Sequence, residues 1–145
     1  MQDRYVDPSR AQFDAFKALP RQAPVAMLNL VRYRDRAEYP ADHPYARKSL
    51  SGEAAYARYG QESAAAFARA GGTILFTGRM ACMVIGPDDK RWDRVFIAHY
   101  PTAAGFLGML SDPEYKAAVV NRTAAVETSR LIRLDPGPKD TGRFA

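Results

Sequence analysis

Apolar residues fall along this chain in two patterns, unbroken runs of strand length and spaced positions of helical period. Residues 24–33 and 94–100 are nearly continuous apolar runs. Such runs predict strands buried on both faces, since a strand with one face in water alternates between apolar and polar residues. Residues 73–85 predict one long strand with a bend at Gly78, and residues 129–134 predict a last, shorter strand.

Three further stretches carry apolar residues at spacings of three and four, the period of an amphipathic helix. Each follows a side chain that caps helices well, and these caps are Ser51, Thr102 and Asp112. The helix behind Asp112 is expected to extend through Val126. A short additional helix near the N-terminus is expected to begin at Asp7-Pro8, where the aspartate caps and the proline takes the first helical position.

The core order is therefore strand, helix, strand, strand, helix, strand, which is the split βαβ arrangement of a ferredoxin-like domain. This predicts an α+β fold with an antiparallel-type mixed sheet, helices on one face and an extra N-terminal helix. We expect a helical arm over residues 1–23, the domain over 24–134 and a flexible tail over 135–145. The connection 34–50 is unusually long, and a lid or partner-contacting loop and a solvated insertion explain it equally well.

Such a sheet would carry more apolar surface than helices on one face can cover. On the first strand Val25, Met27 and Val31 point to one side, while Ala26, Leu28 and Leu30 point to the other. Monomeric proteins rarely expose an apolar patch of several hundred Å². Burying ~600 Å² per subunit would contribute on the order of 15 kcal/mol before association costs, so we expect a homodimer packed sheet to sheet. The rival cover is the N-terminal arm or the long loop folded beneath the sheet.

Several segments resemble, in order and spacing, the family called domain of unknown function 1330 (DUF1330). They are the run Val25–Val31 with its Asn-Leu pair, the helix stop Gly71-Gly72-Thr73, the strand Arg94–Tyr100 followed by Pro101-Thr102-Ala103-Ala104, and the stretch from Ser111-Asp112-Pro113-Glu114-Tyr115 to Arg122. The resemblance covers about residues 24–134 and implies the dimeric α/β barrel superfamily, which includes cofactor-independent monooxygenases, haem-handling enzymes and lactone isomerases. DUF1330 itself has no established reaction, and a shared fold does not confer one.

Two polar residues, Asn29 and His99, interrupt the central apolar runs. If their strands are parallel neighbours, the two side chains meet near the strand ends. A neutral imidazole held by an amide could then serve as the catalytic acid or base, because histidine titrates near physiological pH. The alternatives are a buried hydrogen-bonded pair without chemistry and a histidine that touches water at a strand end.

Four residues on the predicted helices are candidates for substrate binding. Arg122 falls on the inner side of the last helix, where its planar guanidinium could hold a carboxylate through two hydrogen bonds. Tyr56, Tyr59 and Tyr115 could line a pocket between helices and sheet with their hydroxyls inward. Equally, the arginine could pair within its own chain or reach solvent, and the tyrosines could be ordinary core residues.

Composition narrows the classes of function. The net charge is +5, but the arginines are scattered among acidic residues, so no nucleic-acid partner is expected. No apolar run approaches ~18 residues, so no membrane association is expected, and a cytoplasmic location follows. Cys82 is the only cysteine, and the apolar run 80–85 around it predicts an inert buried thiol. The only two histidines, His43 and His99, give no metal constellation, and no cofactor motif is present.

Two functions stay open at this point. The first is a small-molecule-binding homodimer that works as a cofactor-free enzyme by proton transfer on a polar organic substrate. The second is a non-catalytic binding or structural dimer. No motif in the sequence identifies a ligand or indicates whether the protein is a catalyst.

Overall fold

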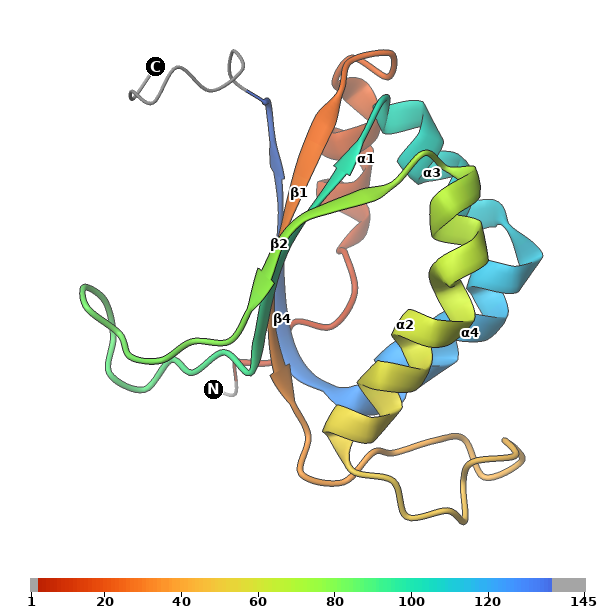
Figure 1. Cartoon of the computed structure of the whole chain (residues 1–145), viewed down its shortest axis with the longest axis vertical. Helices are drawn as coiled ribbons and strands as arrows, with labels where there is room; N and C mark the ends of the chain where they lie inside the picture. The colour runs from red at the N-terminus through yellow and green to blue at the C-terminus, as the bar shows by residue number, and fades with distance from the viewer. Residues whose placement is uncertain (1–2, 137–145) are drawn as a thin grey trace.

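The computed structural model describes residues 3–136, which form one four-stranded antiparallel sheet with helices on one side (Figure 1). The elements in chain order are α1 (Arg10–Ala18), β1 (Val25–Tyr33), α2 (Gly52–Arg69), β2 (Thr73–Gly78), β3 (Arg94–Tyr100), α3 (Ala103–Ser111), α4 (Pro113–Ala125) and β4 (Val126–Leu134). The strand order is β2-β3-β1-β4, which confirms the predicted α+β, ferredoxin-like arrangement. Most of the tail predicted to be flexible, residues 137–145, lies outside the described residues.

The register of the sheet decides which side chains face the helices. Strand β1 pairs with β3 and β4, both antiparallel. Met27 lies opposite Ala98, and these two side chains are buried on the side covered by the helices, which we call the helix face. Leu28 lies opposite Ile97 on the other side, which we call the open face. The two faces therefore carry alternate residues of the same strands.

The prediction for β2 was wrong at its C-terminal end. The strand stops at Gly78, which pairs with Val95 at the start of β3. Beyond that point β3 offers no further partner, so residues 79–93 leave the sheet as the β2–β3 loop. Cys82 lies in this loop and is exposed, which contradicts the predicted buried thiol.

Two helix boundaries also differ from the prediction. Helix α1 begins at Arg10 behind Ser9, because the Ser9 hydroxyl and the Gln12 side chain form a reciprocal capping box that Asp7 cannot provide. Helix α4 ends at Ala125, and Val126 already belongs to β4, where it pairs with Tyr33. The caps Ser51, Thr102 and Asp112 are as predicted, each accepting a backbone N–H of its helix.

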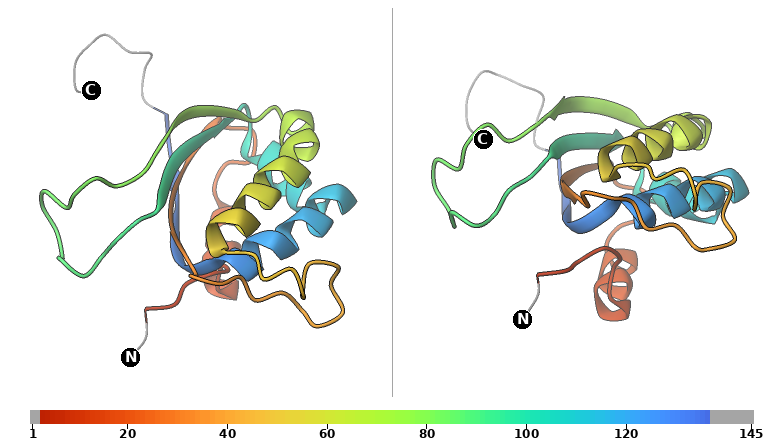
Figure 2. Two further views of the ribbon diagram at one scale, coloured as in Figure 1. Left: turned by 60° about the horizontal axis from the view of Figure 1, so that its bottom comes forward. Right: turned by 90° about the horizontal axis from the view of Figure 1, so that it is seen from below.

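Neither helix α1 nor the connection 34–50 lies beneath the open face. Helix α1 sits on the helix side, where Phe16 packs against Phe106 of α3 (Figure 2). The connection 34–50 docks against α2 and α4 through hydrogen bonds from Tyr39 to Asn121 and from Tyr45 to Glu62.

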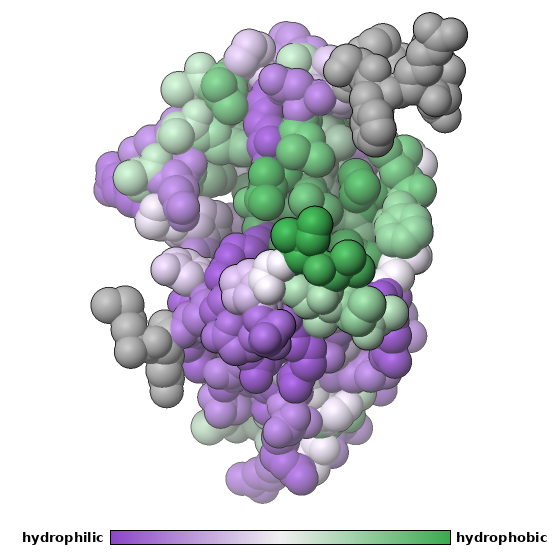
Figure 3. All heavy atoms as spheres, turned by 90° about the vertical axis from the view of Figure 1, so that its left-hand side faces the viewer, coloured by the Kyte–Doolittle hydropathy of each residue, from purple (hydrophilic) through white to green (hydrophobic). Residues whose placement is uncertain are grey.

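Apolar side chains consequently gather on the open face (Figure 3). Phe76, Ile132 and Leu134 are 58%, 43% and 38% exposed there. Within residues 3–136, no helix has both the length and the apolar character needed to cross a bilayer.

Candidate functional site

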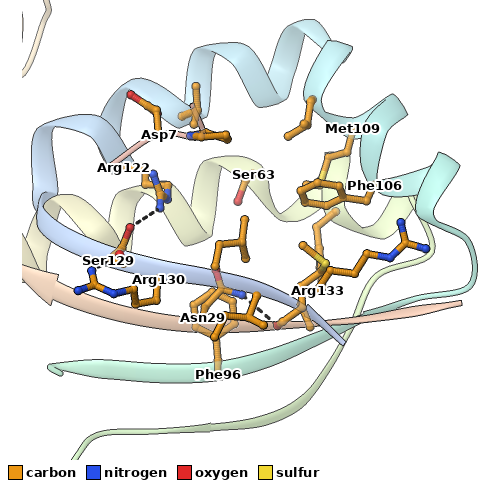
Figure 4. Close-up of a pocket in the computed structure, with 18 of the residues that line it drawn as sticks. Asp7, Asn29, Ser63, Phe96, Phe106, Met109, Arg122, Ser129, Arg130 and Arg133 are labelled. Atoms are coloured by element: carbon orange, nitrogen blue, oxygen red, sulfur yellow. Dashed lines mark hydrogen bonds between the residues drawn. The ribbon is translucent and has the colours of Figure 1, made fainter. Parts of the chain in front are cut away.

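A cavity of about 1320 Å³ lies between the helix face of the sheet and the helices that cover it. We call it the chamber (Figure 4). All four helices and all four strands contribute side chains or backbone to its wall, and α1 and the segment before it close one side. No residue of the connection 34–50 is part of the wall, so that connection is not a lid of this chamber.

Most of the chamber wall is apolar. The sheet contributes Met27, Phe96 and Leu131, and the helices contribute Phe13, Phe16, Phe67, Phe106, Met109, Leu110 and Val119. Aromatic rings and thioethers of this kind offer large, polarisable contact surfaces to a bound organic molecule. A mainly apolar lining with a few polar groups is typical of a small-molecule site.

Polar groups concentrate at one end of the chamber, where α4 meets the start of β4 (Figure 4). The Arg122 guanidinium donates to the Val6 carbonyl at 2.7 Å and to the Ser129 hydroxyl at 3.2 Å. Ser129 in turn donates to the Tyr5 carbonyl at 2.8 Å. These contacts fix the direction of the guanidinium while using only two of its five N–H groups.

Tyr56 of α2 brings a hydroxyl to the same end. Its ring is held between Tyr33 and Tyr59, with centroids 5.4 and 5.3 Å away. Its hydroxyl is buried and has no hydrogen-bond partner among residues 3–136. Burial raises the pKa of this hydroxyl above its ordinary value, and the positive charge of Arg122 opposes that rise. Tyr56 therefore stays protonated, and its hydroxyl keeps a donor that no group in the described residues accepts.

The other two predicted tyrosines also line the chamber but are satisfied by each other. The hydroxyls of Tyr59 and Tyr115 lie 2.9 Å apart. Burial, together with the neighbouring phenols, raises the pKa of Tyr59 well above its ordinary value. The Tyr59 phenol is therefore a neutral hydrogen-bonding group rather than a base at physiological pH.

The expected meeting of Asn29 and His99 is contradicted by the register. The strands β1 and β3 are antiparallel, and His99 lies opposite Ala26 while Asn29 lies opposite Phe96. Three positions separate them along the strands, so their side chains point to opposite faces. Asn29 lines the chamber and donates to the Met27 carbonyl at 3.1 Å. His99 is on the open face and takes no part in the chamber wall.

Sequence reasoning thus placed Asn29, Tyr56, Tyr59, Tyr115 and Arg122 on one cavity, although their functional roles stay predictions. It missed Ser63, Ser129 and Arg133, which also line the chamber. The alternation of β4 could have revealed two of them, because residues 129, 131 and 133 share the helix face. Ser63 gave no such indication, since one serine within a helical pattern is unremarkable.

Positive charge dominates the chamber wall. Three arginines of the helix side line it, Arg94, Arg122 and Arg133, against one carboxylate, Asp7, whereas the Arg130 guanidinium at the β4 edge is paired with Asp3. Arg133 is turned toward α1, where it donates to the backbone of Phe16 and Pro20. No cluster of three or more metal-binding side chains occurs in the described part of the chain.

The fold and this cavity define the protein as a ferredoxin-like α+β domain with an internal chamber whose polar end is cationic. The family model for the domain of unknown function DUF1330 matches residues 46–133, and the chain belongs to this family.

The chain is also similar to solved structures. The crystal structure of RPA0582, a protein of unknown function from Rhodopseudomonas palustris, is 47% identical, with a TM-score of 0.84 over 93% of this chain and 98% of that one. The methylated form of RPA0582 gives 45% identity and a TM-score of 0.87 over 95% and 98%. A protein from Bacteroides fragilis, described as dimeric and ferredoxin-like, is 15% identical with a TM-score of 0.48 over 79% and 98%. None of the proteins with curated descriptions matches this chain.

Proposed function

We propose that this protein is a homodimer in which the chamber of each subunit binds a small organic carboxylate with an apolar body. The observation that carries the proposal is the pair of donors at the polar end of the chamber. There, Arg122 has N–H groups to spare, and the buried Tyr56 hydroxyl lacks an acceptor. A carboxylate oxygen accepts from both kinds of donor at once, and hydrogen bonds to a charged group are the strong ones.

The remainder of the chamber supports an apolar body for the ligand. Its wall beyond the polar end is made of phenylalanine, methionine and leucine side chains, and its volume of about 1320 Å³ exceeds the needs of a metabolite-sized acid. The excess of arginines over acids along the wall favours an anion over a cation or a neutral molecule.

The geometry favours binding over proton transfer. His99, the group expected to serve as acid or base, lies on the open face. Burial keeps the pKa values of Tyr56 and Tyr59 raised, so both hydroxyls donate hydrogen bonds but do not take up protons.

The apolar open face supports the homodimer. It carries exposed Phe76 and Ile132, and neither α1 nor the connection 34–50 covers it. A second copy of the chain is the simplest partner for the open face, because a two-fold axis lets the same self-complementary patch be buried on both subunits.

Binding can be tested by isothermal titration calorimetry with 2-naphthoate and, as an uncharged match, methyl 2-naphthoate. We expect one naphthoate per subunit and much weaker binding of the ester. Arg122→Gln and Tyr56→Phe should each weaken naphthoate binding by about 10- to 100-fold, the effect of losing a hydrogen bond to a charged group.

Arg10→Gln is the matched charge control, because the Arg10 side chain is 94% exposed and is not part of the chamber wall. It should bind naphthoate as the parent does. Circular dichroism and thermal unfolding establish that each variant is folded, and Tyr56→Phe keeps the shape of the site should Arg122→Gln prove unstable. Equal binding of acid and ester, or unchanged affinity in both site variants, would show that the polar end is not a carboxylate site.

A further inference from the structure

The β2–β3 loop, residues 79–93, carries the most exposed apolar side chains of the described chain. Val84 is 85% exposed and Ile85 is 92% exposed. They belong to the uncharged run 80–85, which we call the loop tip. A solvated loop usually carries polar residues at its tip, so this composition indicates a contact surface.

The stem of this loop is fixed to the body of the domain. The Met80 amide donates to the Trp92 carbonyl across the stem at 3.2 Å. Lys90 contacts the Asp3 carboxylate, and the Arg130 guanidinium lies over the Trp92 ring at 5.3 Å from its centroid. The loop is therefore held in position although its tip touches little, and binding through the tip requires less ordering than binding through a disordered loop would.

The loop extends to the same side as the open face, away from the helices (Figures 1 and 2). Any molecule seated on that face must therefore lie beside the loop. Figure 3 shows that apolar residues gather in one area on this side.

The loop tip carries a large share of the apolar surface that a dimer interface needs. At ~150 Å² for a fully exposed large apolar side chain, the exposed fractions of Phe76, Ile132 and Leu134 on the open face amount to about 210 Å² of apolar surface, and Val84 and Ile85 together add about 270 Å². A standard interface takes about 800 Å² from each partner, of which roughly 450 Å² is apolar. The tip therefore more than doubles the strongly exposed apolar surface on this side and brings it to about the amount that an interface needs.

We infer that the tip of the β2–β3 loop of one subunit packs against the open face of a second copy of this chain, so that the two loops flank the paired sheets. The inference rests on the homodimer proposed above and names the segment that completes its interface. A second copy fits because both surfaces occur on every subunit, and a two-fold axis places each tip beside the other subunit's sheet.

The test combines sedimentation equilibrium with the reactivity of Cys82, the only cysteine of the chain and a member of the tip. We expect the parent to dimerise and the double variant Val84→Ser/Ile85→Ser to raise the dimer dissociation constant at least 10-fold. The double variant Asp88→Ser/Asp89→Ser changes the same loop without removing apolar surface and should stay within about twofold of the parent. In the parent, Ellman's reagent should modify Cys82 more slowly above the dissociation constant than below it.

Three results would overturn the inference. In the first, the Val84/Ile85 variant dimerises as the parent does, and Cys82 reacts at the same rate at every protein concentration. The loop is then not part of the interface, although the protein is still a homodimer. Slow modification of Cys82 even in dilute monomer means that the tip packs on its own sheet. A parent that sediments as a monomer at 100 µM refutes the homodimer itself and the loop contact with it.

Discussion

Replacing Tyr56 by phenylalanine should stabilise the ligand-free protein while weakening its binding site. The Tyr56 hydroxyl is buried without a partner among residues 3–136. An unsatisfied buried hydroxyl costs about 1–3 kcal/mol, and phenylalanine removes that cost without leaving a large cavity. The ring contacts with Tyr33 and Tyr59 stay in place. We expect a gain of about 1 kcal/mol in the free energy of unfolding and a rise of roughly 2–4 °C in Tm.

Tyr59→Phe is the matched control, because it makes the same chemical change on the same helix with the opposite expected sign. The Tyr59 hydroxyl shares a 2.9 Å hydrogen bond with Tyr115, and its removal leaves the Tyr115 hydroxyl without that partner. The expected loss is about 1–2 kcal/mol.

Equilibrium unfolding in urea at one fixed protein concentration measures both variants, since dimerisation would make apparent stability depend on concentration. The comparison requires that the parent and both variants have the same m-value, the slope of unfolding free energy against urea concentration. If Tyr56→Phe is destabilised as much as Tyr59→Phe, the Tyr56 hydroxyl has a partner in the free protein, and the reasoning that reserves it for a ligand is refuted.

Two further variants test the fold around the site. Hydrogen bonds from Arg130 and Lys90 lower the pKa of Asp3 to about 2. The ionised Asp3 carboxylate therefore stabilises the fold fully above its ordinary pKa of 3.8, and this stabilisation is lost as the pH falls toward 2. The stability difference between the parent and Asp3→Asn should therefore shrink between pH 4 and pH 2, and a difference that is constant from pH 2 to pH 7 would contradict this. A Cβ on Gly52 would collide with the Arg34 carbonyl oxygen, whereas one on Gly60 meets no atom within 4 Å. In thermal unfolding, Gly52→Ala should lower the free energy of unfolding by about 3 kcal/mol, whereas Gly60→Ala should raise it by about 0.5–1 kcal/mol. If the two variants change the stability by similar amounts, the close approach of the Arg34 carbonyl to Gly52 is refuted.

Local chemistry made most elements predictable from the sequence. Ser51 and Asp112 cap their helices because a short polar side chain reaches the backbone N–H groups of the next turn, whatever the rest of the chain does. Arg122 was placed toward the sheet by helical period alone. The apolar runs of β1 and β3 needed only their length and composition.

The errors arose where the answer depends on a partner strand. The apolar run that continues past Gly78 has the composition of a strand, but the pairing of β2 with β3 ends at Gly78, opposite Val95. The same lack of a partner explains the exposure of Cys82. The faces of Asn29 and His99 depend on strand direction and register, which neither run contains. The unpartnered Tyr56 hydroxyl likewise depends on what every other element brings near it.

The chamber and the open face share one structural support. The segment before α1 crosses the edge of the sheet at β4, so that Asp3 contacts Lys90 and Arg130 beside the loop stem while the Val6 carbonyl holds Arg122 at the polar end of the chamber. Substitutions in this segment therefore disturb both surfaces and cannot assign an effect to one of them. Tyr56 lies on the helix side of the sheet, whereas Val84 lies in the β2–β3 loop on the side of the open face (Figure 1). A loss of ligand binding in Tyr56→Phe with an intact dimer, and a loss of dimer in the loop variant with an intact chamber, would separate the two proposed functions on physical grounds.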